Sequence, residues 1–278
     1  DDTIHVPATQ ALVAHLLKRG INGLVPLGGT GEYGALSRTE RAKMARVVVD
    51  AVAGQVPVIP GVLDPGFHDA LDAGKAFAGE GADALLVLTP YYTNPTQQGI
   101  RDYFMRYADA SPLPILLYEI PYRTRIAITP EVLHELSRHE RIIGMKACNT
   151  DMYHFLRTVA GVDKSFAVLS GEDTLFPLHV AAGARGGVVV TATLLPHVWQ
   201  RIHTLASTGH TAEALALHRE LMPLMDMAFA ETNPGPMKSV MDLIGVNAPA
   251  MLAPLVPPAP ALQSRLRAEL VKQLAREQ

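Results

Sequence analysis

The sequence lacks both the long apolar segment of a membrane protein and the clustered charge of a nucleic-acid-binding protein. Its longest apolar stretch, around residues 186–195, is much shorter than the run of about 20 residues that crosses a bilayer. The 27 acidic and 24 basic residues are interspersed, so no basic surface is predicted. We therefore expect neither a nucleic-acid partner nor a membrane partner.

Cysteine is almost absent as well. A single cysteine, Cys148, excludes an internal disulfide framework and is typical of a reducing compartment. The first residues lack the basic-then-apolar order of a signal peptide, so we expect a cytoplasmic protein. His134 and His139 are five positions apart, whereas a helical zinc pair needs four. Neither a metal nor another cofactor is predicted.

Short apolar runs alternate with amphipathic stretches along most of the chain. The runs are mostly continuous in Val, Ile and Leu, as in parallel strands that are buried on both faces. Ser37 and Thr129 are predicted to cap the helices that follow them. The predicted strands are Ile21–Leu27, Val56–Val62, Ala84–Thr89, Pro114–Ile120, Ile142–Ala147, Phe166–Ser170 and Gly187–Ala192. The predicted helices between them are Arg38–Ala53, Phe67–Gly79, Thr96–Asp109, Pro130–Arg138, Met152–Val159 and Leu175–Ala182.

Seven nearly evenly spaced strands favour an α/β fold of the (β/α)8 TIM-barrel type over a doubly wound sheet. A closed barrel has eight strands, and residues 1–20 read as the helix that follows a first strand. We therefore expect the first strand to be absent from this sequence. We divide the chain into a barrel, residues 1–195, and a C-terminal helical extension packed on it, residues 196–278. The helices predicted for the extension are Val198–Ser207, Thr211–Ala228, Gly235–Leu243 and Ala259–Arg276.

Lys146 is the sharpest candidate for chemistry. Functional residues of such barrels collect at the C-terminal ends of strands, and Lys146 lies near the end of an apolar strand. Burial lowers the pKa of an ammonium group, and the neutral amine can attack a ketone to form an imine, or Schiff base. A lysine that snorkels to solvent or pairs with an acid fits the position equally well.

Three neighbouring segments could complete a site. Tyr118, near the end of the preceding strand, could transfer protons, and Arg123, in the loop after it, could bind a carboxylate. Alone, each is more typical of a core tyrosine or a solvated arginine. The segment from Gly29 to Gly34 matches a dinucleotide-binding turn, but such a site needs an acid at the end of the next strand, about 20 residues on. The first acid after that strand is Asp64, thirty residues past Gly34. A carboxylate-binding turn is therefore favoured.

Taken in order, these segments resemble the dihydrodipicolinate synthase / N-acetylneuraminate lyase family of Schiff-base-forming class I aldolases. The resemblance covers almost the whole chain. The matching segments are Gly28-Gly-Thr-Gly-Glu32, Thr89-Pro-Tyr-Tyr92 with Pro95-Thr-Gln-Gln-Gly99, Tyr118 to Thr124, Gly144-Met-Lys146, Ser170-Gly-Glu-Asp173 and Asn233-Pro-Gly-Pro-Met-Lys238. Six motifs in the family order identify the chain as a member and imply a lyase.

The resemblance implies three catalytic residues. Lys146 would form the imine with pyruvate or another 2-oxo acid, and Tyr118 would transfer protons. Tyr92 would reach into the site of the neighbouring subunit in a tight dimer. The resemblance further implies a homotetramer built as a dimer of dimers, with small-molecule substrates.

Five further residues are implied to bind substrate. Thr30 and the amides of its turn, including that of Gly29, would hold the pyruvate carboxylate. Arg123 would orient the carboxylate of the second substrate. Gly171 and Val188 would line the pocket through their backbone carbonyls.

Within the family, Arg123 favours a synthase that condenses pyruvate with aspartate semialdehyde. Gly29, however, replaces the threonine that links the two tyrosines in the synthases, and its turn also resembles that of ketodeoxy sugar-acid dehydratases. Glu119 replaces the asparagine that follows the tyrosine. Tyr33 and Pro65 replace a small and a polar residue of lysine-inhibited synthases, which argues against lysine feedback.

Three functions therefore remain open at this point. The first is the synthase, and the second is a related aldolase or dehydratase that acts on a 2-keto-3-deoxy sugar acid or a 4-hydroxy-2-oxo acid. The third is a non-catalytic relative that binds 2-oxo acids as a sensor.

Overall fold

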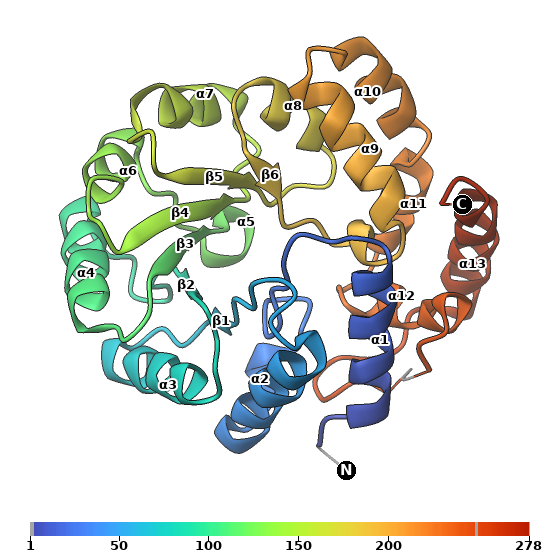
Figure 1. Cartoon of the computed structure of the whole chain (residues 1–278), viewed down its shortest axis with the longest axis horizontal. Helices are drawn as coiled ribbons and strands as arrows, with labels where there is room; N and C mark the ends of the chain where they lie inside the picture. The colour runs from blue at the N-terminus through green and yellow to red at the C-terminus, as the bar shows by residue number, and fades with distance from the viewer. Residues whose placement is uncertain (1–2, 248–249, 278) are drawn as a thin grey trace.

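The computed structural model describes residues 3–247 and 250–277, in which a parallel sheet lies inside a ring of helices (Figure 1). Its six strands pair in sequence order, and every neighbouring pair is parallel. The strands are β1 Gly61–Val62, β2 Leu85–Leu88, β3 Ile115–Glu119, β4 Ile142–Ala147, β5 Ala167–Ser170 and β6 Gly186–Gly187. This order, with a helix in each connection, is the one that the alternating pattern predicted.

The helices follow the same alternation up to residue 195 and then continue without strands in the described residues. The helices of the first part are α1 Val6–Lys18, α2 Arg38–Val52, α3 Phe67–Gly79, α4 Gln97–Ala110, α5 Pro121–Thr124, α6 Pro130–Leu136, α7 Met152–Gly161 and α8 Phe176–Ala181. Those of the C-terminal part are α9 Pro196–Ser207, α10 Thr211–Arg219, α11 Met222–Ala228, α12 Gly235–Lys238 and α13 Pro260–Leu274. Three short 3-10 helices are η1 Tyr33–Ala35, η2 Thr191–Thr193 and η3 Met241–Ile244.

Successive side chains of a strand point to opposite sides of the sheet and so belong to two different apolar layers. On β3, Leu116 and Tyr118 belong to a cluster inside the sheet, whereas Ile115 and Leu117 belong to the larger core between sheet and helices. The inner cluster consists of Ala84, Leu86, Leu88, Leu116, Tyr118, Ile120 and Cys148. A polar side chain that points inward on β3 or β4 therefore faces the interior of the barrel.

The first predicted strand, Ile21–Leu27, was too long. Its described residues contribute one parallel bridge, between Leu24 and Val58. Pro26 has no N–H to donate, and Leu27 has a φ of 61°, which takes the chain out of the extended conformation. The predicted N-terminal helix is confirmed as α1, and no strand precedes it in the described residues.

Two other predicted strands are shorter for local reasons. Val56–Val62 is reduced to β1 because Pro57 and Pro60 interrupt the row of donors. Gly187–Ala192 is reduced to β6, and its last residues enter η2. The carboxylate of Asp173 stabilises this turn, because it accepts hydrogen bonds from the backbone N–H groups of Val190 and Thr191.

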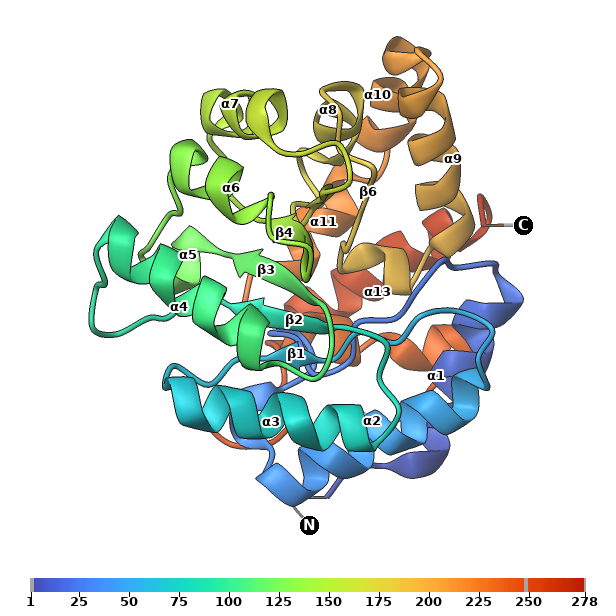
Figure 2. The same ribbon diagram turned by 60° about the vertical axis from the view of Figure 1, so that its left-hand side comes forward.

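Two C-terminal helices were predicted as single elements and are divided. Thr211–Ala228 separates into α10 and α11 because Pro223 lies in the first turn of α11, where it cannot continue a preceding helix. Gly235–Leu243 separates into α12 and η3. In Figure 2, α13 lies between α11 and α1. The division at residues 195 and 196 stays a prediction.

Helix starts were predicted with mixed success. Ser37 caps α2 as expected, since its side chain accepts a hydrogen bond from the backbone N–H of Glu40 at 3.2 Å. Thr129 is the N-cap residue of α6, with Pro130 at its start and Glu131 in its first turn, as predicted, but its side chain makes no cap hydrogen bond. No helix in the described residues is both long and apolar enough to span a membrane.

Candidate active site

Tyr118 and Lys146 lie side by side on neighbouring strands. They are register partners at the C-terminal ends of β3 and β4. Both side chains belong to positions that face the barrel interior, and the Lys146 Nζ lies 4.6 Å from the centroid of the Tyr118 ring. An amine and a phenol are thus held together at the end of the barrel where catalytic groups collect.

The charge of Lys146 depends on its two neighbours. Burial lowers the pKa of this amine, attraction to Tyr118 and Cys148 raises it, and the net direction is upward. That attraction requires a phenolate and a thiolate. Burial raises the pKa of Tyr118 and of Cys148 to about 12, so both are neutral at neutral pH. The attraction to these two groups is then absent, and burial, the largest single influence on the pKa of Lys146, favours the neutral, nucleophilic amine.

The expectation from sequence, a pKa lowered by burial, therefore holds only while these neighbours are uncharged. It left out the phenol and the thiol because neither contact could be deduced from spacing. At high pH the phenolate and thiolate would hold the ammonium form of Lys146.

The glycine turn and Arg123 close the site on another side. A Cβ placed on Gly29 would lie 3.7 Å from the Arg123 guanidinium carbon and 3.8 Å from the Tyr118 hydroxyl. Gly29, Arg123 and Tyr118 therefore meet at one point. Arg123 was predicted in a loop, but it lies on the short helix α5.

Residues of the C-terminal extension bind the glycine turn, residues 28–32, through hydrogen bonds and an ion pair. The Asn233 side-chain amide donates to the Thr30 hydroxyl oxygen at 2.8 Å. The Lys238 ammonium pairs with Glu32 at 2.7 Å, and the Leu252 backbone N–H donates to the same carboxylate at 2.9 Å. Two segments about 200 residues apart in the sequence are thereby fixed to each other.

This link was missed in the sequence, although both of its motifs had been noticed. Asn233 and Lys238 are the first and last residues of their motif, and Thr30 and Glu32 lie in the glycine turn. Nothing in the spacing of either motif shows that they touch.

Gly171 lies directly against the lysine. A Cβ at this position would lie 2.1 Å from the Cys148 sulfur and 2.9 Å from the Lys146 Cε. Val188 lies next to it, because its backbone N–H donates to the carbonyl of Ser170 at 2.8 Å. Both residues are thus at the site, and the roles of their carbonyls stay a prediction.

Glu172 is a titratable group of this site that the sequence did not single out. Burial raises its pKa to about 7, with Asp173 adding to the rise and Lys146 opposing it. A carboxyl group that changes charge near neutral pH therefore lies within electrostatic range of Lys146.

Tyr92 is the one predicted site residue that stands apart from this group. Its side chain is 89% exposed and its φ is 78°, a strained conformation for a residue other than glycine. It borders a surface hollow of about 380 Å³ that is also lined by Pro65, Gly66, Tyr91 and Thr93. The chain thus presents Tyr92 outward.

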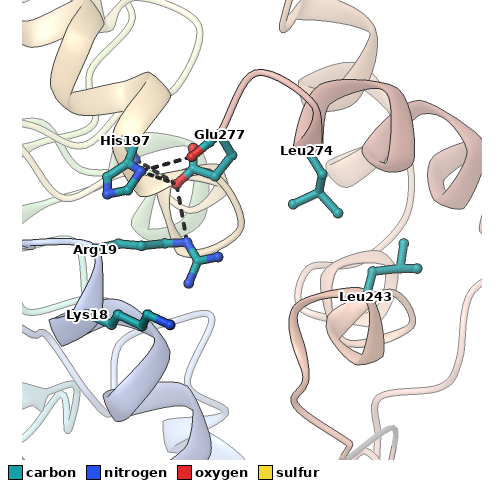
Figure 3. Close-up of a pocket in the computed structure, with 6 residues that line it drawn as sticks. All are labelled: Lys18, Arg19, His197, Leu243, Leu274 and Glu277. Atoms are coloured by element: carbon teal, nitrogen blue, oxygen red, sulfur yellow. Dashed lines mark hydrogen bonds and ion pairs between the residues drawn. The ribbon is translucent and has the colours of Figure 1, made fainter.

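A second hollow, of about 360 Å³, lies away from the site between α1, α9 and the C-terminal residues (Figure 3). Its acidic group, Glu277, is already used: the Glu277 carboxylate accepts from the backbone N–H groups of His197 and Val198 and lies 3.6 Å from Arg19. None of the predicted site residues lines this hollow. Within the part of the chain that the structure describes, no group of three or more His, Cys, Asp and Glu residues is arranged to bind a metal.

Comparison with known proteins shows the family of the chain. Residues 1–273 match the profile of the dihydrodipicolinate synthetase family. A 4-hydroxy-tetrahydrodipicolinate synthase of Acidiphilium cryptum is 34% identical over 270 residues, which cover 97% of this chain and 92% of that protein.

Solved structures of the same kind are similar along almost their full length. The dihydrodipicolinate synthase of Thermotoga maritima has a TM-score of 0.93 and 30% identity, with 97% of this chain and 92% of that chain covered. A chloride-inhibited dihydrodipicolinate synthase of Acinetobacter baumannii, complexed with pyruvate, has a TM-score of 0.92 and 28% identity, with 96% and 92% covered.

Proposed function

Because this chain belongs to the dihydrodipicolinate synthetase family, and is thus a lyase with an α/β-barrel fold and a C-terminal helical region, we propose that it condenses pyruvate with aspartate semialdehyde through an imine on Lys146. The observation that carries this proposal is the pairing of Lys146 with Tyr118, with Arg123 and the glycine turn at the same point.

In this proposal, Lys146 and Tyr118 perform the chemistry. The neutral amine of Lys146 attacks the ketone carbon of pyruvate, and water leaves to give the imine. Loss of a proton from the methyl group gives an enamine, whose carbon attacks the aldehyde. Tyr118, a neutral phenol with a pKa of about 12, donates and accepts the protons of these steps.

Thr30 is oriented to bind the pyruvate carboxylate. Its hydroxyl oxygen accepts a hydrogen bond from Asn233, so its own proton is free to donate elsewhere. A carboxylate at the turn would receive this proton together with the backbone N–H groups around Gly29. Gly171 and Val188 would complete the pocket with their carbonyls.

The second substrate is proposed to lie between Arg123 and Gly29. The guanidinium can bind a carboxylate through two parallel hydrogen bonds, which suits aspartate semialdehyde. Gly29, in contrast, leaves a gap between Arg123 and Tyr118, and this observation favours a second candidate. In that alternative, the chain is a related aldolase or dehydratase for a 2-keto-3-deoxy sugar acid or a 4-hydroxy-2-oxo acid, whose hydroxyls would occupy the gap.

Tyr92 is proposed to act across a subunit interface. Its outward position and strained backbone support a role in a partner's site, where it would take part in proton transfer. Without a threonine at Gly29, a water would have to connect Tyr92 with Tyr118. The corresponding assembly is a homotetramer of two such dimers, and the lone, buried Cys148 supports a cytoplasmic location.

Reduction with borohydride in the presence of pyruvate tests the imine. We expect a pyruvate-dependent mass increase located on Lys146 and absent from Lys146→Ala. A panel of aldehydes, measured by pyruvate consumption, then separates the two candidates. Absence of the adduct would refute both enzymatic functions and leave a protein that binds 2-oxo acids without turning them over.

A further inference from the structure

Glu119 lies behind the strand that carries Tyr118. Side chains of β3 alternate, so Tyr118 faces the barrel interior and Glu119 faces the layer between the sheet and the helices. Glu119 is fully buried there. It also stands where the motif that this segment resembles has an asparagine, so a carboxyl group takes the place of an amide.

The Glu119 carboxylate connects three parts of the barrel. Its Oε1 accepts a hydrogen bond from the Ile128 backbone N–H at 3.0 Å and lies 3.4 Å from the His154 Nε2 on α7. Ile128 ends the segment of residues 120–128, which leaves β3 and carries Arg123 on α5. Glu119 therefore fastens the Arg123 segment to α7, the helix that follows β4.

A carboxylate removed from water is stabilised only by the partners it finds in the protein. The contact with Glu119 raises the pKa of His154, and burial opposes the rise. In the described residues, neither the Oε2 of Glu119 nor the Nε2 of His154 makes a hydrogen bond, so the two groups interact through their charges. The contact between Glu119 and His154 is therefore strongest when His154 is protonated.

The other charged groups around α7 have partners of their own. Asp151 caps α7 by accepting from the backbone N–H groups of Tyr153 and His154. Arg157 pairs with Glu131 of α6, the helix packed against α7. Both Asp151 and Arg157 act on His154, the first raising its pKa and the second lowering it, but Glu119 has the larger effect.

We propose that the Glu119–His154 pair is a positioning unit for Arg123 and, through Arg123, for the carboxylate of the second substrate. This rests on the proposed function in one respect, that Arg123 binds this carboxylate. A guanidinium binds a carboxylate in a fixed geometry, so a shift of about 1 Å in its segment weakens binding by one to two orders of magnitude.

Two variants remove the charge and keep the fold. Glu119→Gln retains an oxygen that can accept from the Ile128 N–H, and His154→Gln retains a polar side chain. We expect each to raise the KM for the aldehyde about tenfold, with the KM for pyruvate and the yield of trapped imine unchanged. His139→Gln is the matched control, because it breaks another histidine–carboxylate contact, with Asp109 at 3.1 Å, before β4 begins. It should change none of these values.

The pH dependence and a double variant separate positioning from general stability. In the unmodified protein, the aldehyde KM should rise as the pH rises through the pKa of His154, which lies above its ordinary value of 6.5. Glu119→Gln should flatten that profile. Combined with Arg123→Ala, Glu119→Gln should cause no further rise in the aldehyde KM, because the residue that it positions is already absent.

Amide hydrogen exchange tests the same idea without turnover. In Glu119→Gln, residues 120–128 should exchange faster while β4 exchanges as before.

An unchanged KM for the aldehyde overturns the proposal. An equal loss of imine trapping and of aldehyde turnover also overturns it, since the pair would then act on Lys146. Failure of the unmodified protein to trap pyruvate refutes the proposed function instead, and the exchange of residues 120–128 then decides whether the pair positions the segment.

Discussion

Gly171 shows how closely the side chains around Lys146 are fitted. A methyl group at this position would lie 2.1 Å from the Cys148 sulfur and 2.9 Å from the Lys146 Cε, much closer than real carbon contacts. We expect Gly171→Ala to displace the lysine chain and to lower kcat about 100-fold or more, as measured by steady-state turnover of pyruvate.

Gly29 provides the control for that variant. A methyl group there would make only ordinary contacts, at 3.7 Å to Arg123 and 3.8 Å to Tyr118. Gly29→Ala should keep kcat within about threefold of the unmodified value. Gly29→Thr supplies a hydroxyl beside Tyr118, and it should raise synthase activity if protons pass between Tyr118 and Tyr92. Equal losses in Gly171→Ala and Gly29→Ala would contradict the geometric argument.

Tyr118 carries a prediction of a different kind, about one step of the reaction. Its hydroxyl is needed for proton transfer, whereas the attack on the ketone requires only the amine. Tyr118→Phe should therefore retain borohydride-trapped imine and lose turnover by about 100-fold. Loss of the trapped imine itself would show that the phenol is needed to form it or to hold Lys146 in place.

At this scale, the sequence predicted residues whose position follows from a strand end. Lys146 and Tyr118 could be placed together because neighbouring parallel strands end at the same side of a barrel. The contact between Glu119 and His154 could not, because it depends on which helix covers the back of β3. The pKa of Lys146 was also out of reach, since it depends on a phenol and a thiol that only the folded chain brings near.

Among the elements, the C-terminal extension has a direct effect on the site. Lys238 on α12 pairs with Glu32 at 2.7 Å, and both side chains are mostly buried. Lys238→Met should loosen the glycine turn and raise the KM for pyruvate several-fold, with a smaller change in kcat. Lys272→Met is the control, because Lys272 also pairs with a glutamate in the extension, at 3.4 Å, but is largely exposed. A similar KM for pyruvate in both variants would disprove the role of the Lys238–Glu32 pair.

Elements were predicted well where apolar periodicity dominates and poorly where single residues interrupt it. Most helices of the first 195 residues were found within a few residues, because each buries one apolar stripe. The strands that contain prolines were predicted too long, because the apolar pattern does not reveal that proline lacks the backbone N–H needed for strand pairing. The short helix α5, which carries Arg123, has too few residues to show any period at all.

At the scale of the whole molecule, two buried histidines make stability depend on pH. Burial lowers the pKa of His15 and of His179 to about 4. Between about pH 6.5 and 4 the unfolded chain binds protons that the folded chain rejects, so stability is present above pH 6.5 and is lost as the pH falls. The loss is at most about 3 kcal/mol for each histidine.

Urea unfolding at pH 7.5 and pH 5 measures this loss. We expect His15→Gln to reduce the difference between the two pH values, and the exposed His210→Gln to leave it unchanged. Glu172 acts in the opposite direction, because its raised pKa of about 7 makes the folded chain bind an extra proton. An unchanged difference in His15→Gln would show that this histidine is charged in the folded protein.

The barrel itself was predictable because seven apolar segments alternate with helical ones in the sequence, and this pattern is recognisable even though only six of the segments form strands of the sheet. The assembly was not predictable from spacing, and the exposed, strained Tyr92 is what makes it testable. If Tyr92 completes a partner's site, two inactive variants should complement each other. Tyr92→Ala retains Lys146, and Lys146→Ala retains Tyr92, so each mixed dimer contains one complete site.

After the two variants are mixed and their subunits exchanged, half of the dimers are mixed, and each has one working site of two. Activity should therefore return to about a quarter of that of the unmodified protein. Each variant carried alone through the same exchange is the control. No recovery despite proven exchange of subunits would mean that Tyr92 acts within its own chain, because no mixed dimer would then contain a complete site. Full activity of Tyr92→Ala alone would mean that Tyr92 does not act at all.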